Sequence, residues 1–339
     1  MLNKGPLLKY FYKVSVTFRG DYWRAGWQMF IHHPLFGVGL DRYGAYFRQY
    51  RDASQSLRRG PNLVSNAAHD IPIQLAATGG IFVILAYLIF SIFIISRGLI
   101  TLKRTHGPRQ VLAVTIFAAW LAYFAQSLIS IDNLGIAIWG YILGGAVVGI
   151  SVEQQETKST PRKISILQPV ISIFAALLMI LISAQFFESE LAMNRLARTA
   201  PPQSQANIAE YKQAVEKPLS NFFKEPTMVN IAAGDLAQIG DIQGALVLTK
   251  ENVKSSPRFF EAQELLARIY EYEKNWKLAI PVRLYLLKID PFNQINMLQL
   301  GEDYKNIGAK VEATALAARI NSFAPQSPEA KQAQLDFGN

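Results

Sequence analysis

The chain has 339 residues, half of them hydrophobic, and it contains no cysteine. A disulfide framework and a thiolate metal site are therefore excluded. The formal net charge of +9 is concentrated near the N-terminus, where the first 70 residues hold ten Lys and Arg against four Asp. Mean hydropathy is positive, and apolar residues gather between residues 72 and 187, which indicates a membrane part and a separate soluble part.

Residues 1–70 are a basic and aromatic segment in which short helices are predicted. Four bulky apolar residues recur at helical spacing and predict a helix suited to a membrane interface: Trp23, Trp27, Phe30 and Ile31. Residues 33–39 read His-Pro-Leu-Phe-Gly-Val-Gly, which predicts a tight turn that ends this helix. A second short helix is expected next, with one aromatic face formed by Tyr43, Phe47 and Tyr50, and residues 58–62 are expected to form a loop.

Four stretches are long and apolar enough to cross a membrane, namely residues 73–96, 111–130, 134–152 and 164–187. The third stretch contains Gly140-x-x-x-Gly144 and Gly145-x-x-x-Gly149, spacings that allow helices to approach closely. Either these glycines mark a tight helix contact, or they reflect the ordinary tolerance of membrane helices for glycine.

The connections between these stretches predict their orientation. Cations occupy the first connection (Arg97, Lys103, Arg104, Arg109) and the third (Lys158, Arg162, Lys163), whereas the short turn around Asp132 has none. The positive-inside rule then places residues 1–70 and the tail from residue 188 outside the cytoplasm. Because no signal peptide precedes this basic outward segment, we expect the chain to be the C-terminal piece of a larger membrane protein with further spans before residue 1.

The tail is predicted to be soluble and helical, with a linker helix over residues 188–220, an irregular linker near residues 199–205, and repeats over residues 221–339. Three kinds of residue recur every 34 positions: Ala245, Ala279 and Ala313; Leu236, Tyr270 and Tyr304; Pro257, Pro291 and Pro325. This period looks like tetratricopeptide repeats, with two full repeats and a degenerate earlier one over residues 221–254. The repeats either bind a protein partner or act as a spacer. The predicted fold class is all-α, with about four transmembrane helices before the repeats.

Three motifs occur in order before and at the start of the first apolar stretch. They are Arg19-x-x-x-Trp23, then Pro34-Leu35-Phe36-Gly37-Val38-Gly39, then Ala68-His69-Asp70 with Gln74-Leu75-Ala76-Ala77-Thr78-Gly79. Together they resemble the O-antigen ligase family, which includes O-antigen polymerases and bacterial O-oligosaccharyltransferases. Two positions depart from the family pattern: Asp70 stands where Asn is usual, and Thr78 precedes the glycine where an acidic residue is often found.

The resemblance implies a polytopic glycosyltransferase of the bacterial inner membrane, without a metal or other cofactor, that serves cell-surface polysaccharide or lipopolysaccharide assembly. It would transfer a glycan from an undecaprenyl-diphosphate carrier to a glycan, lipid or protein acceptor at the outer face. By carry-over from the family motifs, Arg19 would hold the diphosphate and His69 would handle the acceptor hydroxyl. The other candidate residues are the cations Arg24, Arg48 and Arg51, which would attract phosphate, and the supporting residues Asp70 and Trp23. Asp70 could orient His69 or cap the following helix.

Two other classes of protein fit the same sequence features less well. A non-catalytic scaffold would use the membrane helices as an anchor and the repeats to recruit partners in polysaccharide assembly. A transporter fragment is disfavoured because the four apolar stretches lack intramembrane charges. The basic surplus near the N-terminus indicates anionic lipid head groups or lipid-linked phosphates as partners rather than nucleic acid, for which no motif is present. Whether the enzyme would be a ligase or a polymerase stays open.

Overall fold

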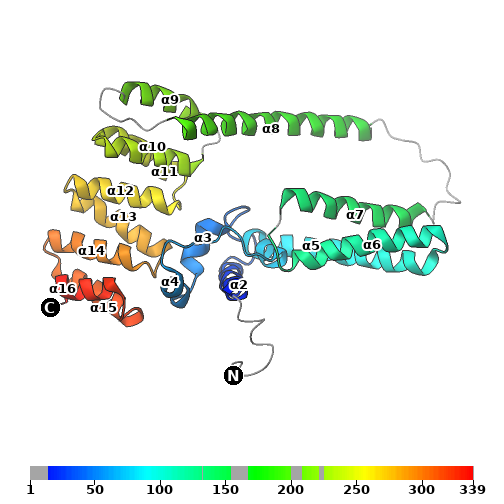
Figure 1. The fold of residues 1–339 in the computed structure, drawn as a ribbon, viewed down its shortest axis with the longest axis horizontal. Coiled ribbons are helices and arrows are strands. Elements are labelled where there is room, and N and C mark those ends of the chain that lie inside the picture. The colour runs from blue at the N-terminus through cyan, green and yellow to red at the C-terminus, as the bar shows by residue number, and fades with distance from the viewer. Residues whose placement is uncertain (1–13, 132, 154–166, 200–207, 221–224, 339) are drawn as a thin grey trace. The chain divides into compact units, whose positions relative to one another are not determined.

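The computed structural model describes residues 14–131, 133–153, 167–199, 208–220 and 225–338, and every regular element in these ranges is an α-helix (Figure 1). The predicted all-α class is therefore confirmed. The turn residue Asp132, the basic residues Lys158, Arg162 and Lys163, and most of the predicted irregular linker lie outside the described residues. The chain divides into two units, Met1–Arg162 and Lys163–Asn339.

Within its described residues, the first unit has three shorter helices followed by a bundle of three longer ones. The short helices are α2 (Val14–His32), α3 (Tyr43–Tyr50) and α4 (Ala53–Arg59), and the long ones are α5 (Ile71–Arg104), α6 (Pro108–Ser127) and α7 (Leu134–Glu153). The three long helices lie side by side (Figure 1) around a small core formed by Ile94, Phe117, Trp120 and Val147.

Glycines of α7 differ in what they face. A Cβ at Gly140 would lie 2.3 Å from the ring of Tyr123, and one at Gly144 would lie 2.7 Å from the Ile94 side chain. At Gly145 and Gly149, no atom lies within 4 Å of such a Cβ. The first small-xxx-small pair is therefore a close helix contact, whereas the second pair faces open space within the described part of the chain.

All four predicted spans are confirmed as long apolar helices, which makes the chain a multi-pass membrane protein. They are Ile71–Arg104, Pro108–Ser127, Leu134–Val152 and Pro169–Arg195. The first is longer than predicted, so Arg97, Lys103 and Arg104 belong to the helix and residues 105–107 alone connect it to α6. Most of the large apolar side chains of these helices are exposed, as lipid-facing residues are in a membrane.

A break divides α5 into two helices at Gly80, whose φ of 71° and ψ of −165° are not helical. Residues 71–79 form a short helix, and residues 81–104 form a second one of about 24 residues. At 1.5 Å per residue the second helix is roughly 36 Å long, enough to cross a hydrocarbon core of about 30 Å. The second helix is therefore long enough by itself to cross the membrane.

The predicted turn over residues 33–39 fills this break. Three backbone hydrogen bonds join the turn to α5: from Val38 N–H to the Ala77 carbonyl (2.9 Å), from Gly39 N–H to the Thr78 carbonyl (3.0 Å), and from Ile81 N–H to the Pro34 carbonyl (2.7 Å). They satisfy backbone groups that a helix end leaves without an intrahelical partner. The backbones approach so closely that a Cβ on Gly37 or Gly80 would lie 2.4 Å or 2.3 Å from an atom of the opposite segment. The turn that contains Gly37 and Gly39 and the break at Gly80 therefore interlock.

The segment after α3 differs from its prediction. Residues 58–62 were expected to form a loop, but Arg58 and Arg59 are the last two residues of α4. This helix begins at an N-cap, Asp52, whose carboxylate accepts a hydrogen bond from the Gln55 N–H (2.8 Å). The cap holds a helix of about two turns that would be too short to be stable by itself.

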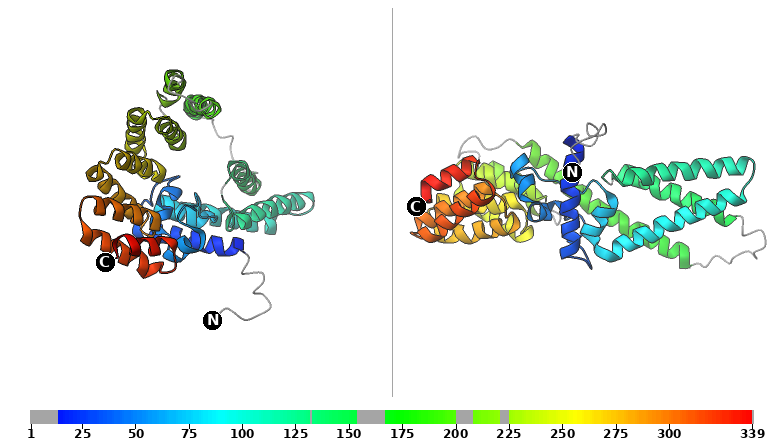
Figure 2. Two further views of the ribbon diagram at one scale, coloured as in Figure 1. Left: turned by 60° about the vertical axis from the view of Figure 1, so that its left-hand side comes forward. Right: turned by 90° about the horizontal axis from the view of Figure 1, so that it is seen from below.

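The second unit begins with a long helix and continues as stacked helix pairs. Its helices are α8 (Leu167–Arg198), α9 (Ile208–Ser220), α10 (Pro226–Gln238), α11 (Ile242–Ser255), α12 (Phe260–Tyr272), α13 (Trp276–Ile289), α14 (Gln294–Asn306), α15 (Lys310–Phe323) and α16 (Pro328–Phe337). The first helices of successive pairs begin at Pro226, Phe260 and Gln294, each 34 residues after the one before. Figure 2 shows the pairs stacked in chain order. The repeat over residues 221–254, predicted to be degenerate, contains α10 and α11, which have the same lengths as α12 and α13 of the next repeat.

Small residues lie where the paired helices cross. Ala245, Ala279 and Ala313 are 0%, 0% and 1% exposed, which allows the backbones to pack closely. The predicted linker helix over residues 188–220 comprises the end of α8 and the whole of α9. Met193 and Tyr211, one from each, pack in the same core as the first repeat, so this segment is part of the repeat core.

A buried ionic cluster joins the second and third helix pairs. The Arg283 side chain is 1% exposed and donates to both carboxylate oxygens of Glu271, at 2.6 Å and 3.0 Å. Asp303 is 2% exposed and lies near this pair. Burial, together with the negative charges of Glu271 and Glu302, raises the pKa of Asp303 to about 7, although the Arg283 charge opposes the shift.

Candidate active site

The candidate site lies where α2 and α3 pack against the start of α5 (Figure 1). One face of α2 enters a core in which Ala25, Met29, Tyr43, Phe47 and Ala77 are almost completely buried. This core fixes α2 against the short helix of residues 71–79 and so determines which α2 side chains reach the chain just before α5.

Residues 68–70 are held rigidly at the N-terminus of α5. The Asp70 carboxylate accepts a hydrogen bond from the Ile73 N–H (2.8 Å), so this residue caps the helix, one of the two roles expected for it. The Gln74 side-chain oxygen accepts a hydrogen bond from the Ala68 N–H (2.8 Å). Between these two anchors, His69 has a φ of 56°, a conformation that few residues other than glycine adopt. The backbone therefore presents His69 in one defined direction.

The structure brings Arg19 and His69 into one site. The His69 ring stacks on Tyr22, with 5.2 Å between the ring centroids and 24° between the planes, and Tyr22 follows Arg19 by three residues on α2. Burial, and next the nearby positive charge of Arg19, lower the pKa of His69. Near neutral pH the imidazole is therefore uncharged and able to accept a proton.

The other predicted cations are engaged by the protein. Arg24 forms an ion pair with Asp52. Arg48 and Arg51 are buried and donate to backbone carbonyls, Arg48 to that of Pro61 (2.7 Å) and Arg51 to that of Leu63 (3.3 Å). These contacts favour a structural role for Arg48 and Arg51, which secure the chain after α4. Contact with substrate stays a prediction for all three arginines.

Trp23, predicted as a supporting residue, lies partly buried on α2, and its indole N–H is buried without a hydrogen-bond partner in the described part of the chain. Trp27 and Ile31, which belong to the same predicted apolar face, are 54% and 51% exposed. An outward apolar face of this kind suits a membrane interface, as the spacing of these residues indicated.

Two further groups of the site were missed by sequence reasoning. Asp21, 9% exposed, accepts a hydrogen bond from Arg58 (2.8 Å) and lies 3.4 Å from a guanidinium nitrogen of Arg59. Arg59 lies over the Phe18 ring and donates to the Tyr22 hydroxyl (3.2 Å). A signal was available, because Asp21 is the only acidic residue among the first 40.

The remaining histidines of the unit have local partners or lie elsewhere. His33 forms a hydrogen bond with the Tyr50 hydroxyl (3.0 Å), and His32 one with the Gln28 carbonyl of its own helix (2.8 Å). His106 lies in the connection between α5 and α6, at the opposite end of α5 from His69. Within the described ranges, no three His, Asp or Glu side chains converge as metal ligands would.

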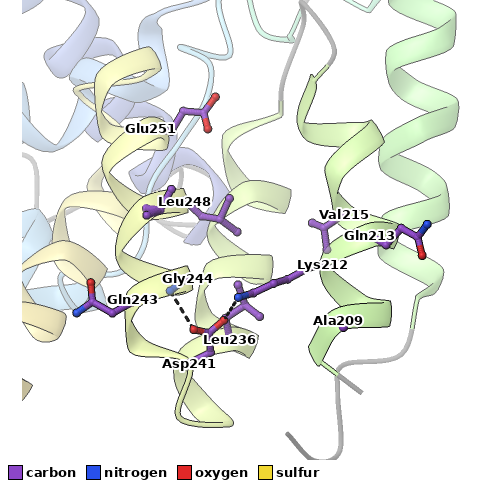
Figure 3. Close-up of a pocket in the computed structure, with 11 residues that line it drawn as sticks. Ala209, Lys212, Gln213, Val215, Leu236, Asp241, Gln243, Gly244, Leu248 and Glu251 are labelled. Atoms are coloured by element: carbon purple, nitrogen blue, oxygen red, sulfur yellow. Dashed lines mark hydrogen bonds and ion pairs between the residues drawn. The ribbon is translucent and has the colours of Figure 1, made fainter. Parts of the chain in front are cut away.

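A groove of about 810 Å³ lies in the second unit, between α9 and the pair α10–α11 (Figure 3). The Lys212 ammonium is 2.5 Å from an Asp241 carboxylate oxygen, and that carboxylate also accepts a hydrogen bond from the Gly244 N–H (3.1 Å). The hydrogen bond from Lys212 lowers the pKa of Asp241. Apolar side chains, among them Leu236 and Leu248, line much of the rest, together with the polar Gln213, Gln243 and Glu251. This lining suits packing or docking rather than group transfer.

The family comparison coincides with the site described above. The O-antigen ligase family model matches residues 11–88. This segment is therefore similar to the O-antigen ligase domain. It contains Arg19, Tyr22 and His69 as well as the interlocked glycine motifs, and its match ends within α5. No curated protein matches the chain. The helix α6, the helix α7 and the whole second unit lie beyond the matched residues.

Proposed function

We propose that the chain is a membrane glycosyltransferase that transfers a glycan from a polyprenyl-diphosphate carrier to an acceptor hydroxyl. The observation that carries the proposal is the juxtaposition of a permanent cation, Arg19, and an uncharged histidine, His69, in the O-antigen ligase domain at one end of a membrane span. A diphosphate leaving group and a hydroxyl nucleophile need these two kinds of group.

In the proposed reaction the acceptor oxygen attacks the anomeric carbon of the donor. A C–O bond forms to the acceptor, and the bond from the anomeric carbon to the diphosphate oxygen breaks. His69 takes the hydroxyl proton, and the polyprenyl diphosphate leaves with its electron pair and its negative charge next to Arg19. A guanidinium can bind phosphate oxygens through two parallel hydrogen bonds, which suits it to this role.

The location of the site on the outer side of the inner membrane is part of the proposal. Lys103, Arg104 and Arg109 lie around the connection between α5 and α6, at the opposite end of the span from the Gly80 break and the site. The positive-inside rule assigns that cationic end to the cytoplasm. The site would then face outward, where lipid-linked glycans are joined to their acceptors in the family that the domain matches.

The helix pairs of the second unit are proposed to be tetratricopeptide-type repeats that dock a protein partner outside the cytoplasm. Their 34-residue spacing and the buried alanines at the helix crossings support the repeat type. The partner, the sugar and the choice between ligase and polymerase are not needed for the transfer chemistry proposed above.

The test is a comparison of surface glycans in cells that express the gene with His69→Gln, Arg19→Lys or Arg19→Ala. His32→Gln is the matched control, because His32 is exposed and bonds only to a carbonyl of its own helix in the described structure. Loss of a general base is expected to reduce transfer by roughly 10²–10⁴-fold, and immunoblots of membranes establish equal protein levels. Unchanged glycans with His69→Gln and Arg19→Ala would instead favour a non-catalytic scaffold.

A further inference from the structure

We propose that Tyr22 is the positioning residue of this site and that its ring face holds the His69 imidazole beside Arg19. Arg59, anchored on Asp21, holds the Tyr22 ring in its turn. The inference deepens the proposed function, since it assigns to the acceptor-handling histidine the groups that orient it.

The stack between Tyr22 and His69 is the first observation. The two rings are nearly parallel, at 24°, with centroids 5.2 Å apart, so that the Tyr22 ring covers one face of the imidazole. The His69 backbone adopts a φ of 56° and is anchored on both sides by bonds to the first turn of α5. With the backbone fixed and one ring face covered, few orientations of the imidazole remain.

The second observation is that Tyr22 is itself held by two other helices, α3 and α4. Its carbonyl accepts a hydrogen bond from the Tyr43 hydroxyl of α3, and burial raises the pKa of Tyr43, so this donor keeps its proton. Its ring meets Phe47 edge to face, with centroids 5.8 Å apart. Its hydroxyl accepts a hydrogen bond from Arg59 of α4 (3.2 Å). Tyr22 is therefore a rigid support, as a positioning residue must be.

The third observation concerns Arg59. Its side chain is only 5% exposed, which would be costly for a cation without compensation. The compensation comes from α2, where Asp21 supplies a carboxylate and where the Phe18 and Tyr22 rings offer their faces. Arg59 donates to the Tyr22 hydroxyl and is paired with Asp21, the residue before Tyr22. This arrangement suits Arg59 to hold the Tyr22 ring.

The charged groups around His69 come from three helices. Arg19 on α2 is close enough to lower the pKa of His69, and Arg59 on α4 lies on the Tyr22 ring that stacks on His69. Asp70 at the start of α5 directs its carboxylate to the Ile73 N–H. The cover supplied by Tyr22 and the Arg19 charge both disfavour the protonated imidazole. Removal of the ring is therefore expected to let water reach His69 and to make it easier to protonate.

The experiment measures protonation of His69 in the full chain in detergent or lipid nanodiscs, without any requirement for glycan transfer. Diethyl pyrocarbonate modifies neutral imidazoles, so the labelling of each histidine is followed by peptide mass spectrometry over a pH series. His32, exposed on the same molecule, is the internal reference. The midpoint for His69 in the wild-type chain is the value with which the variants are compared.

The variants separate the ring from the hydroxyl. Tyr22→Phe keeps the stacked face and loses only the hydrogen bond from Arg59, so it should shift the His69 midpoint less than a ringless variant does. Tyr22→Leu removes the ring, so the His69 midpoint should rise above its wild-type value and transfer should fall by roughly tenfold or more, because a displaced base loses much of its contribution. Tyr22→Met, an unbranched alternative, serves if Tyr22→Leu does not accumulate. The idea fails if the ringless variants leave the midpoint unmoved, or if Tyr22→Phe shifts it as far as they do.

These outcomes are distinct from those of the proposed function. If His69→Gln leaves surface glycans unchanged while Tyr22→Leu still moves the His69 midpoint, the positioning role stands and the transferase function falls. If transfer requires His69 but the His69 midpoint is the same with Tyr22→Leu as in the wild-type chain, the function stands and the positioning role falls.

Discussion

The interlock between the turn at residues 33–39 and the break in α5 makes a quantitative prediction for Gly80→Ala. At this position φ is 71°, and a Cβ would lie 2.3 Å from the Leu35 carbonyl oxygen. Alanine in a backbone region reserved for glycine costs about 1–3 kcal/mol. The clash also separates the two segments and breaks their three hydrogen bonds, at about 1 kcal/mol each. The expected loss of unfolding free energy is therefore roughly 4–6 kcal/mol.

The matched control is Gly60→Ala. Gly60 has a φ of 81° and a ψ of 157°, close to the backbone region of Gly80, but no atom lies within 4 Å of its Cβ position. Gly60→Ala should lower the unfolding free energy only through backbone strain, by about 1–3 kcal/mol. Unfolding of the purified chain in detergent, followed by intrinsic tryptophan fluorescence against denaturant, measures both. If Gly80→Ala is no more destabilising than Gly60→Ala, the close approach of the two segments does not contribute to stability and the interlock is refuted.

Three further predictions, made with five substitutions, test the energetics of both units. Asp303→Asn should stabilise the repeat unit at neutral pH by at most roughly 4 kcal/mol, because the pKa of Asp303 is raised to about 7. The protonated carboxyl stabilises the fold, and this stabilisation is lost as the pH rises through that value. A pH series of thermal melts that is equally steep with and without the substitution would contradict this. Asp70→Ala should cost about 1 kcal/mol in chemical unfolding through loss of the cap, whereas Asp70→Asn should cost little, and equal losses would refute the capping role. Gly234→Ala should raise the melting temperature, because its Cβ would meet open space inside a helix, where alanine is favoured over glycine by about 0.5–1 kcal/mol. Gly301→Ala should lower the melting temperature, because its Cβ would lie 2.6 Å from the Phe337 ring. Shifts of the same sign would contradict the packing at Gly301.

Periodic and contiguous features of this protein could be determined from its sequence. The four spans are runs of about 20 apolar residues, a length set by the bilayer, and all four are helices in the structure. The 34-residue repeat is visible because stacked helix pairs need the same small residues, such as Ala245 and Ala279, at each crossing. Arg19 and His69 were proposed from ordered motifs whose residue types suit phosphate binding and proton transfer.

Only the tertiary structure decided how distant residues combine. Nothing periodic in the sequence links Tyr22 to His69 or to Arg59, because their contacts arise from the crossing of α2 with α4 and the start of α5. The break at Gly80 lies inside a stretch that was predicted as one span, and it depends on a turn more than 40 residues earlier in the chain that fills the gap. The burial of Arg48 likewise follows from a carbonyl that folding places next to it. Local composition sets which helices form and where they cross the membrane, whereas the orientation of the histidine depends on contacts that exist only once those helices pack.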